Sequence, residues 1–189
     1  MPLLRGKIIL LVLPKSQFRE EELESLRPSL VKEGVRVIVL TKTGRELRGM
    51  KNTRLQPDGI LVDWDKQPGI RGKYAAVLVL GGKGSAKSLW DDPILPQILT
   101  DHHRAGKLVG AISESVVVIA KSGLVQGSCP APNDLKTRRM LEELGVKPLD
   151  RPFSISDRVL IAKNAASELV VQKVLEEIGR VLLNGSAEN

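Results

Sequence analysis

The stretch KLVGAISESVVVIAKSG, residues 107–123, decides the fold of this chain. Its apolar run, residues 108–112, has the length of a buried strand and is followed directly by Ser113 and a helix-like segment. Several hydrolase and transferase families present a reactive side chain on a strand that turns sharply into a helix. The stretch therefore predicts a strand-to-helix elbow with Ser113 at the turn.

Similar apolar runs recur along the chain and alternate with helical patterns. Aliphatic runs without alternation suit strands covered on both faces of a parallel sheet, and three more occur, at residues 7–13, 35–40 and 74–80. Less regular strands are expected at residues 60–64 and, as a pair around Asp157-Arg158, at residues 153–162. Helices are expected over residues 18–31 after a cap at Ser16, 94–104 after Asp91 or Asp92, 135–144, and 168 to about 183 after Ser167.

This alternation predicts an α/β fold, a doubly wound sandwich with a mostly parallel central sheet. In the last helix, the side chains expected to face inward are Leu169, Val170, Val174, Ile178, Val181 and Leu182. A short mobile tail is expected at residues 188–189. In such folds the functional residues lie at the carboxyl ends of the strands, which is where the elbow lies.

Length and composition favour one domain over residues 1–189, with its core at about residues 7–183. No early segment has the parts of a signal peptide, and no apolar run approaches the roughly 20 residues of a membrane helix. A soluble cytoplasmic protein is expected. One cysteine and two histidines exclude an internal disulfide and a Cys/His zinc set, and no cofactor is expected.

The net charge of +7 is spread along the chain. Arg45, Arg48, Lys51 and Arg54 lie close together, but no run is rich in both basic and aromatic residues. Nucleic-acid binding usually requires a concentrated basic face. Nucleic acid is therefore not an expected partner.

The segment GGKGSAKS, residues 81–88, nearly fits a phosphate-binding loop. Lys87 and Ser88 stand where the phosphate lysine and the magnesium hydroxyl belong, but Ala86 replaces the second glycine. A tight turn between strand and helix is the preferred interpretation. Nucleotide binding through Gly81–Ser88 is the less favoured alternative.

Ser113 needs a base to become a nucleophile, and that base is usually a histidine. His102 and His103 precede the strand that leads to Ser113, and five strand residues span roughly 16 Å. Both histidines are expected on the helix surface, at the end of the strand away from the elbow. Cys129, in a loop after the elbow helix, is expected to be an unreactive, partly buried residue.

The residues LVLGGKGSAKSLWDDP, AGKLVGAISES and AKSGLVQG, in this order and spacing, resemble the ThiJ/PfpI superfamily, the DJ-one group related to class I glutamine amidotransferases. The resemblance extends from Lys7 to about Leu183. It implies a flavodoxin-like α/β sandwich that assembles as a homodimer or a larger oligomer.

The resemblance also implies how the site differs from the family's pattern. PfpI-type proteins carry a cysteine and a histidine at the elbow, where this chain has Ser113 and Glu114. The acid supplied from an adjacent subunit falls on Ala86 here. The acid that follows the first strand and contacts the cysteine falls on Gln17. The resemblance therefore implies a degenerate site, without cysteine hydrolase, protease, deglycase or glyoxalase chemistry.

The main-chain part of that site does not depend on side-chain identity. In this architecture Gly82 and the amide of Glu114 would form an oxyanion hole and bind a small carbonyl or anionic ligand. We therefore expect a non-catalytic binding, chaperone-like or regulatory protein. The alternative is a hydrolase of small amide, ester or peptide bonds that uses Ser113, with Glu114 or a group from another subunit as base.

Overall fold

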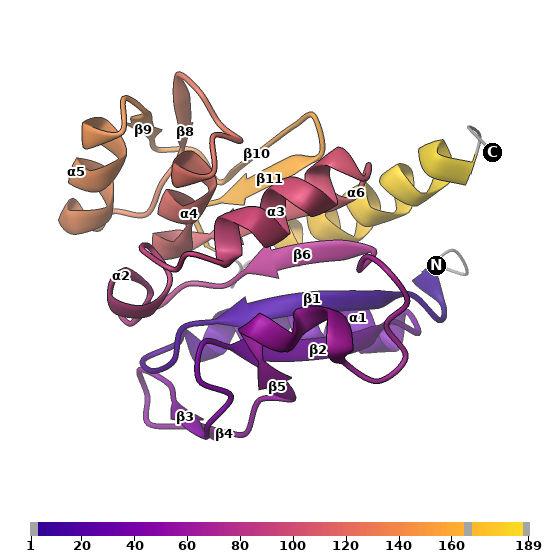
Figure 1. The fold of residues 1–189 in the computed structure, drawn as a ribbon. Coiled ribbons are helices and arrows are strands. Elements are labelled where there is room, and N and C mark those ends of the chain that lie inside the picture. Colours follow the sequence, from indigo (N-terminus) through magenta and orange to yellow (C-terminus); the bar gives the residue numbers. More distant parts are fainter. Residues whose placement is uncertain (1–3, 165–167, 187–189) are drawn as a thin grey trace.

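The computed structural model describes residues 4–164 and 168–186 and shows a seven-stranded sheet between two layers of helices (Figure 1). The strand order is β10-β11-β7-β6-β1-β2-β5. All pairings are parallel except that of β10 with β11. The strands are β1 (Ile8–Leu13), β2 (Arg36–Thr41), β5 (Gly59–Ile60), β6 (Ala76–Val79), β7 (Leu108–Ile112), β10 (Phe153–Ser156) and β11 (Val159–Ala162). The predicted doubly wound α/β fold is confirmed.

Two hydrophobic cores, one on each face of the sheet, explain why the strands lack alternation. In β1, Ile9, Leu11 and Leu13 belong to one core, whereas Leu10 and Val12 belong to the other. Burying each such side chain contributes about 1.5–3 kcal/mol. A continuous aliphatic run is therefore what a central strand of this sheet requires.

The helices divide between the two faces, and short elements complete the fold. On one face, α1 (Glu20–Lys32) packs against α6 (Glu168–Ser186), and on the other α3 (Leu95–Arg104) packs against α4 (Val116–Lys121). The remaining helical segments are α2 (Ser85–Ser88), α5 (Leu135–Glu143), η2 (Leu61–Lys66) and η3 (Ser113–Ser115). The small strand pairs are β3 (Leu47–Arg48) with β4 (Arg54–Leu55), and β8 (Ser128–Pro130) with β9 (Lys147–Leu149).

One turn prediction is confirmed, and one cap prediction is not. Asp92 Oδ1 accepts hydrogen bonds from the main-chain N–H groups of Ile94 and Leu95, at 2.9 and 3.0 Å, but the N-cap of α3 is Ile94, so Asp92 holds the turn that leads into the helix. Asp157 and Arg158 both have positive φ, 47° and 59°, as the tight turn between two antiparallel strands requires.

Several local predictions are wrong. The strand expected at residues 60–64 ends at Ile60, where the chain continues into the 3-10 helix η2. Ser16 does not cap α1, which starts later with Arg19 at its N-cap. The segment with Cys129 forms β8 rather than a loop. Leu169 is 51% exposed rather than inward.

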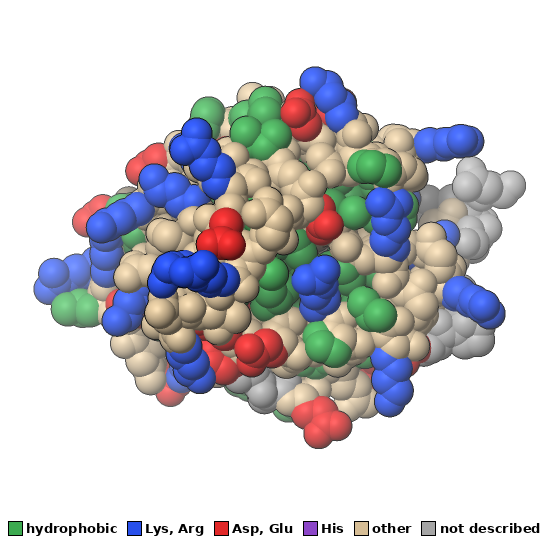
Figure 2. All heavy atoms as spheres, turned by 90° about the horizontal axis from the view of Figure 1, so that it is seen from below, with side chains coloured by type: hydrophobic (Ala, Val, Ile, Leu, Met, Phe, Trp, Pro, Cys, Tyr) green, Lys and Arg blue, Asp and Glu red, His purple; other side chains and the backbone are tan. Residues whose placement is uncertain are grey.

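Ser167 and residues 188–189 lie outside the described residues. Within the described ranges, no helix is both long and apolar enough to cross a membrane. The face shown in Figure 2 carries Lys and Arg side chains from one end to the other, with Asp and Glu between them. That distribution agrees with a spread positive charge.

Candidate functional site

The chain turns from β7 into η3 and α4 at Ser113, at the carboxyl end of β7. Ser113 has φ of +55°, in the left-handed region that a non-glycine residue adopts at a cost of about 1 kcal/mol or more. Close packing holds this conformation, since a Cβ added to Gly81 would lie 2.6 Å from Ser113 Cβ. The strained elbow presents the Ser113 hydroxyl on the side of the sheet that α1 covers.

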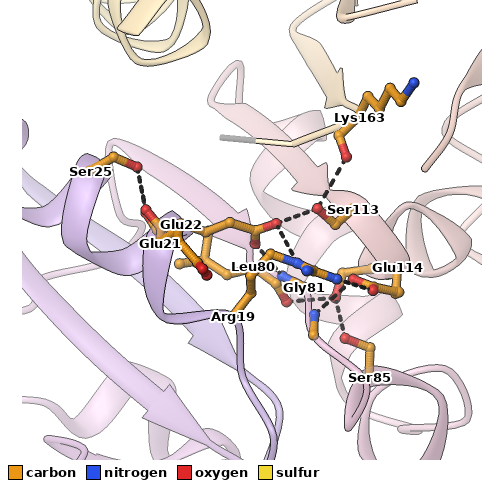
Figure 3. A network of polar contacts seen from close by, with 12 residues as sticks. Arg19, Glu21, Glu22, Ser25, Leu80, Gly81, Ser85, Ser113, Glu114 and Lys163 are labelled. Atoms are coloured by element: carbon orange, nitrogen blue, oxygen red, sulfur yellow. Dashed lines mark hydrogen bonds and ion pairs between the residues drawn. The ribbon is translucent and has the colours of Figure 1, made fainter. Parts of the chain in front are cut away.

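The Ser113 hydroxyl has two oxygen partners (Figure 3). One is Glu22 Oε1, in hydrogen-bond contact, and the other is the main-chain oxygen of Lys163 at 3.1 Å. The Lys163 ammonium points away from Ser113 and binds Asp150. A hydroxyl has one proton, so it donates to one of these oxygens at a time.

Glu22 is fully buried in the first turn of α1, and its Oε2 accepts a hydrogen bond from Gly81 N at 2.7 Å. Burial raises the Glu22 pKa to about 7, although the contacts with Ser113, Gly81 and Arg19 favour the ionised form. A protonated Glu22 can donate to Ser113 Oγ while Ser113 donates to Lys163. In that arrangement Glu22 Oε1, Ser113 Oγ and Lys163 O each take part in a hydrogen bond.

The prediction that Gln17 stands in the position of the acid is wrong. Gln17 is exposed and has φ of 51°, and its main-chain N–H donates to Arg48 O at 2.6 Å. The partners of the Ser113 hydroxyl are instead Glu22 and Lys163. The carboxyl group at Ser113 belongs to Glu22, five residues further along the chain and in the first turn of α1. The sequence did carry a signal, since Glu22 shares the buried face of α1 with Leu26 and Leu30.

The side chain of Glu114 folds back over the elbow. Its Oε1 contacts Arg19 Nη2, and its Oε2 accepts a hydrogen bond from Gly82 N at 2.9 Å. The main chain is fixed as well, because Trp90 Nε1 donates to Glu114 O at 2.8 Å. The N–H of Gly82, expected to serve an oxyanion, is therefore bound by a carboxylate of the chain itself.

Arg19 joins the two glutamates (Figure 3). Its Nε lies 3.5 Å from Glu22 Oε1, while its Nη2 contacts Glu114, and its side chain is 28% exposed. Sequence reasoning missed Arg19, since it lies in an irregular segment before α1. Arg19, Ser113 and Glu114 line an open pocket of about 530 Å3, together with Asn133, Lys163 and Asn164.

The other predicted candidates lie apart from the elbow hydroxyl or are engaged in packing. Cys129 is 1% exposed in β8, and burial raises its pKa to about 11. Ser88 is buried, with its hydroxyl donating to Gly84 O at 2.8 Å and accepting from Lys15 N at 3.2 Å. That hydroxyl is not oriented for a magnesium-bound nucleotide at Gly81–Ser88. Ala86 lies in α2 and lines a small pocket beside Glu114.

The expectation of two surface histidines is wrong for His102. This residue is fully buried, its Nδ1 lies 2.6 Å from Ile98 O, and its Nε2 accepts a hydrogen bond from Tyr74 N at 3.2 Å. Burial lowers its pKa to about 4, so the ring is neutral. His103 contacts Asp157 O at 2.7 Å, in the turn that leads into β11 next to the start of β7. Neither ring is a base for Ser113.

The parallel sheet, the strained elbow and the glutamate beneath it define an α/β protein with a nucleophile-elbow site. Residues 7–177 match the DJ-1/PfpI family, and the chain belongs to that family. Within the described residues, no group of three or more His, Cys, Asp and Glu side chains could hold a metal ion.

Relatives and solved structures agree with this assignment. A Methanocaldococcus jannaschii protein described as uncharacterized is 28% identical over 84% of this chain and 75% of its own length. The glutathione-independent glyoxalase DJR-1.2 of Caenorhabditis elegans is 26% identical over 83% of this chain and 80% of its own. A ThiJ/PfpI domain protein of Brachyspira murdochii shares the fold, with TM-score 0.77, 18% identity and coverage of 95% and 99%.

Proposed function

We propose that this protein is a binding member of the DJ-1/PfpI family whose elbow site takes up a small carbonyl or anionic ligand without turning it over. The observation that carries the proposal is the contact between the Glu114 carboxylate and the N–H of Gly82. An oxyanion formed at Ser113 would need that donor, and a carboxylate beside it would repel the developing charge. A chaperone-like or regulatory role would rest on the same binding site.

The elbow residue supports the same conclusion. The thiolate is the nucleophilic form of cysteine, and it is available near neutral pH where a serine alkoxide is not. The C. elegans relative is named a glyoxalase. We infer that this chain lacks glyoxalase activity because Ser113 provides no thiolate.

The experiment is an assay of the purified protein for glutathione-independent consumption of methylglyoxal, beside a Ser113→Cys variant. The wild type is expected to show no consumption above a Ser113→Ala control. Activity that depends on Ser113 would overturn the non-catalytic proposal.

The Ser113–Glu22 contact favours one alternative, a serine-dependent hydrolase in which Glu22 replaces the usual histidine. A carboxyl group with a pKa of about 7 is suited to proton transfer near neutral pH. A fluorophosphonate probe tests this alternative. Labelling that is lost in both Ser113→Ala and Glu22→Gln would establish it, and absence of labelling would exclude it.

We also propose that the protein is a homo-oligomer, as the family resemblance implies. Light scattering coupled to size-exclusion chromatography measures the molar mass directly. A mass near the 20.6 kDa of one chain at micromolar concentration would contradict the proposal.

A further inference from the structure

The Glu114 carboxylate is bound at the elbow in the way that a separate small carboxylate would be. One oxygen contacts the Arg19 guanidinium and the other accepts a hydrogen bond from Gly82 N at 2.9 Å. A guanidinium and a main-chain N–H are both strong donors to carboxylates, and charge-assisted hydrogen bonds of this kind exceed neutral ones in strength. The two donors therefore constitute a carboxylate site whose occupant belongs to the chain.

Only the side chain of Glu114 has to move for this occupant to leave. Its main-chain oxygen is held by Trp90 Nε1 at 2.8 Å, and the neighbouring Ser115 Oγ donates to Leu80 O at 2.6 Å. These contacts fix the elbow on the side of α2 and β6. Rotation about the Glu114 side-chain bonds can consequently free both donors without disturbing the main chain.

A second pocket offers the rotated side chain a place. Glu114 lines both the pocket of about 530 Å3 that contains Arg19 and a pocket of about 250 Å3 that contains Lys83 and Lys136. Lys136 Nζ lies 5.7 Å from the centre of the Trp90 ring, and in the described part of the chain neither lysine forms an ion pair. Asp134 also borders this pocket, but its carboxylate is bound by Thr137 N at 2.8 Å at the start of α5. Two lysines therefore border the pocket into which Glu114 would turn.

We propose that Glu114 is a two-position gate over a binding site for small monocarboxylates. In the closed position, the one observed, Glu114 binds Arg19 and Gly82. In the open position its carboxylate lies toward Lys83 and Lys136, while the ligand's carboxylate takes the two donors and the rest of the ligand faces the larger pocket. One carboxylate replaces another, so no additional charge is left unpaired beside Arg19. The inference rests on the proposed function, since it names the class of ligand that the same site binds.

The test is a titration of the 15N-labelled protein with sodium acetate, followed by NMR at the Gly82 amide and the Arg19 Nε–H, with sodium chloride at equal ionic strength as control. Glu114→Ala removes the internal competitor and is expected to bind acetate at least about 10-fold more tightly than wild type, because the ligand no longer has to displace a charge-assisted interaction. Adding Arg19→Gln to this variant is expected to abolish binding.

The open position is tested with the double variant Lys83→Ala/Lys136→Ala. It is expected to weaken acetate binding in the wild-type background by several-fold and to leave the Glu114→Ala background unchanged. An equal loss in both backgrounds would overturn the gate, since the lysines would then act on the ligand directly. If Glu114→Ala does not retain the native spectrum, the near-isosteric Glu114→Gln takes its place, with tighter binding than wild type again expected.

Acetate binding by the Glu114 variants that is no tighter than wild type, or equal shifts with chloride, would overturn the carboxylate inference. That result leaves the proposed lack of turnover intact, because none of these measurements depends on Ser113. Conversely, Ser113-dependent turnover would contradict the proposed function while acetate binding persisted. The two failures are thus distinguishable.

Discussion

The carboxyl group of Glu22 contacts the hydroxyl of Ser113 across 91 residues of sequence, inside the core between α1 and the end of β7. The pKa of Glu22 is raised from 4.5 to about 7, mainly by burial. Below pH 4.5 the group is protonated in both the folded and the unfolded chain. Between pH 4.5 and 7 only the unfolded chain releases the proton, so this group's contribution to stability is lost as the pH rises.

Glu22→Gln is therefore expected to remove the Glu22 contribution to the pH dependence, so that between pH 5 and 7 its unfolding free energy changes more positively with pH than that of the wild type. The full effect is at most about 3 kcal/mol, since each pKa unit corresponds to 1.36 kcal/mol. Urea denaturation at pH 5 and pH 7 measures it, with Glu24→Gln on the solvent-exposed side of α1 as control. An unchanged slope in Glu22→Gln would show that Glu22 is ionised throughout this range.

His102 is expected to act in the opposite direction over nearly the same range. Its pKa is lowered from 6.5 to about 4 by burial, so below pH 6.5 the unfolded chain takes up a proton that the folded chain excludes. Stability from this group is present above pH 6.5 and is lost as the pH falls toward 4. The contributions of Glu22 and His102 therefore oppose one another between pH 4.5 and 6.5.

The measurement that separates them is the pH dependence of three proteins by urea denaturation. Glu22→Gln is expected to become more stable as the pH rises from 4.5 to 6.5, whereas His102→Gln is expected to become less stable. The change in the wild type should lie between the two. His103→Gln, at the half-buried neighbouring position, is the control. If the unfolding free energies of Glu22→Gln and His102→Gln changed with pH in the same direction, the prediction that the two groups act in opposite directions would be wrong.

Arg19 is expected to stabilise the fold mainly through the carboxylate of Glu114. Arg19→Gln leaves that side chain, which is 10% exposed, without its cation and should cost about 1–3 kcal/mol. In a Glu114→Gln background the same substitution should cost less, because no buried charge is then left unpaired. The double-mutant cycle by thermal or urea denaturation gives the coupling energy directly. Equal costs in both backgrounds would mean that Arg19 acts through Glu22 or through packing.

Much of the fold could be predicted because a parallel strand that is buried on both faces needs a continuous run of aliphatic residues, which is visible in the sequence. Residues 8–13 and 108–112 read as uninterrupted aliphatic runs since both of their faces are covered. The same reasoning found the elbow at Ser113. The strand expected at residues 60–64 failed because short edge elements have no such signature, and the buried Leu61 fits a 3-10 turn equally well.

The partners at the elbow could not be predicted in the same way. Matching the segment after β1 to the family pattern led to Gln17, but Gln17 is exposed, and the first turn of α1 brings Glu22 inward to Ser113. The direction of the Glu114 side chain depends on Arg19, which is 95 residues away. The helical spacing of Glu22 with Leu26 and Leu30 indicates that its side chain faces inward, but which side chains it and Glu114 then contact is set by tertiary packing.

Gly81 is expected to tolerate no side chain, because β6 and the elbow meet there without space between them. A Cβ at this position would lie 2.6 Å from Ser113 Cβ and 2.8 Å from Ile112 O. Both atoms belong to the strained turn rather than to the end of a flexible side chain, so relief requires a shift of the main chain. Gly81→Ala should therefore destabilise the protein by about 1–3 kcal/mol or more.

Gly185→Ala, in α6 with no atom within 4 Å of the added Cβ, is the matched control and should be neutral or slightly stabilising. Thermal unfolding compares the two, and equal stability would mean that the elbow can move away from β6.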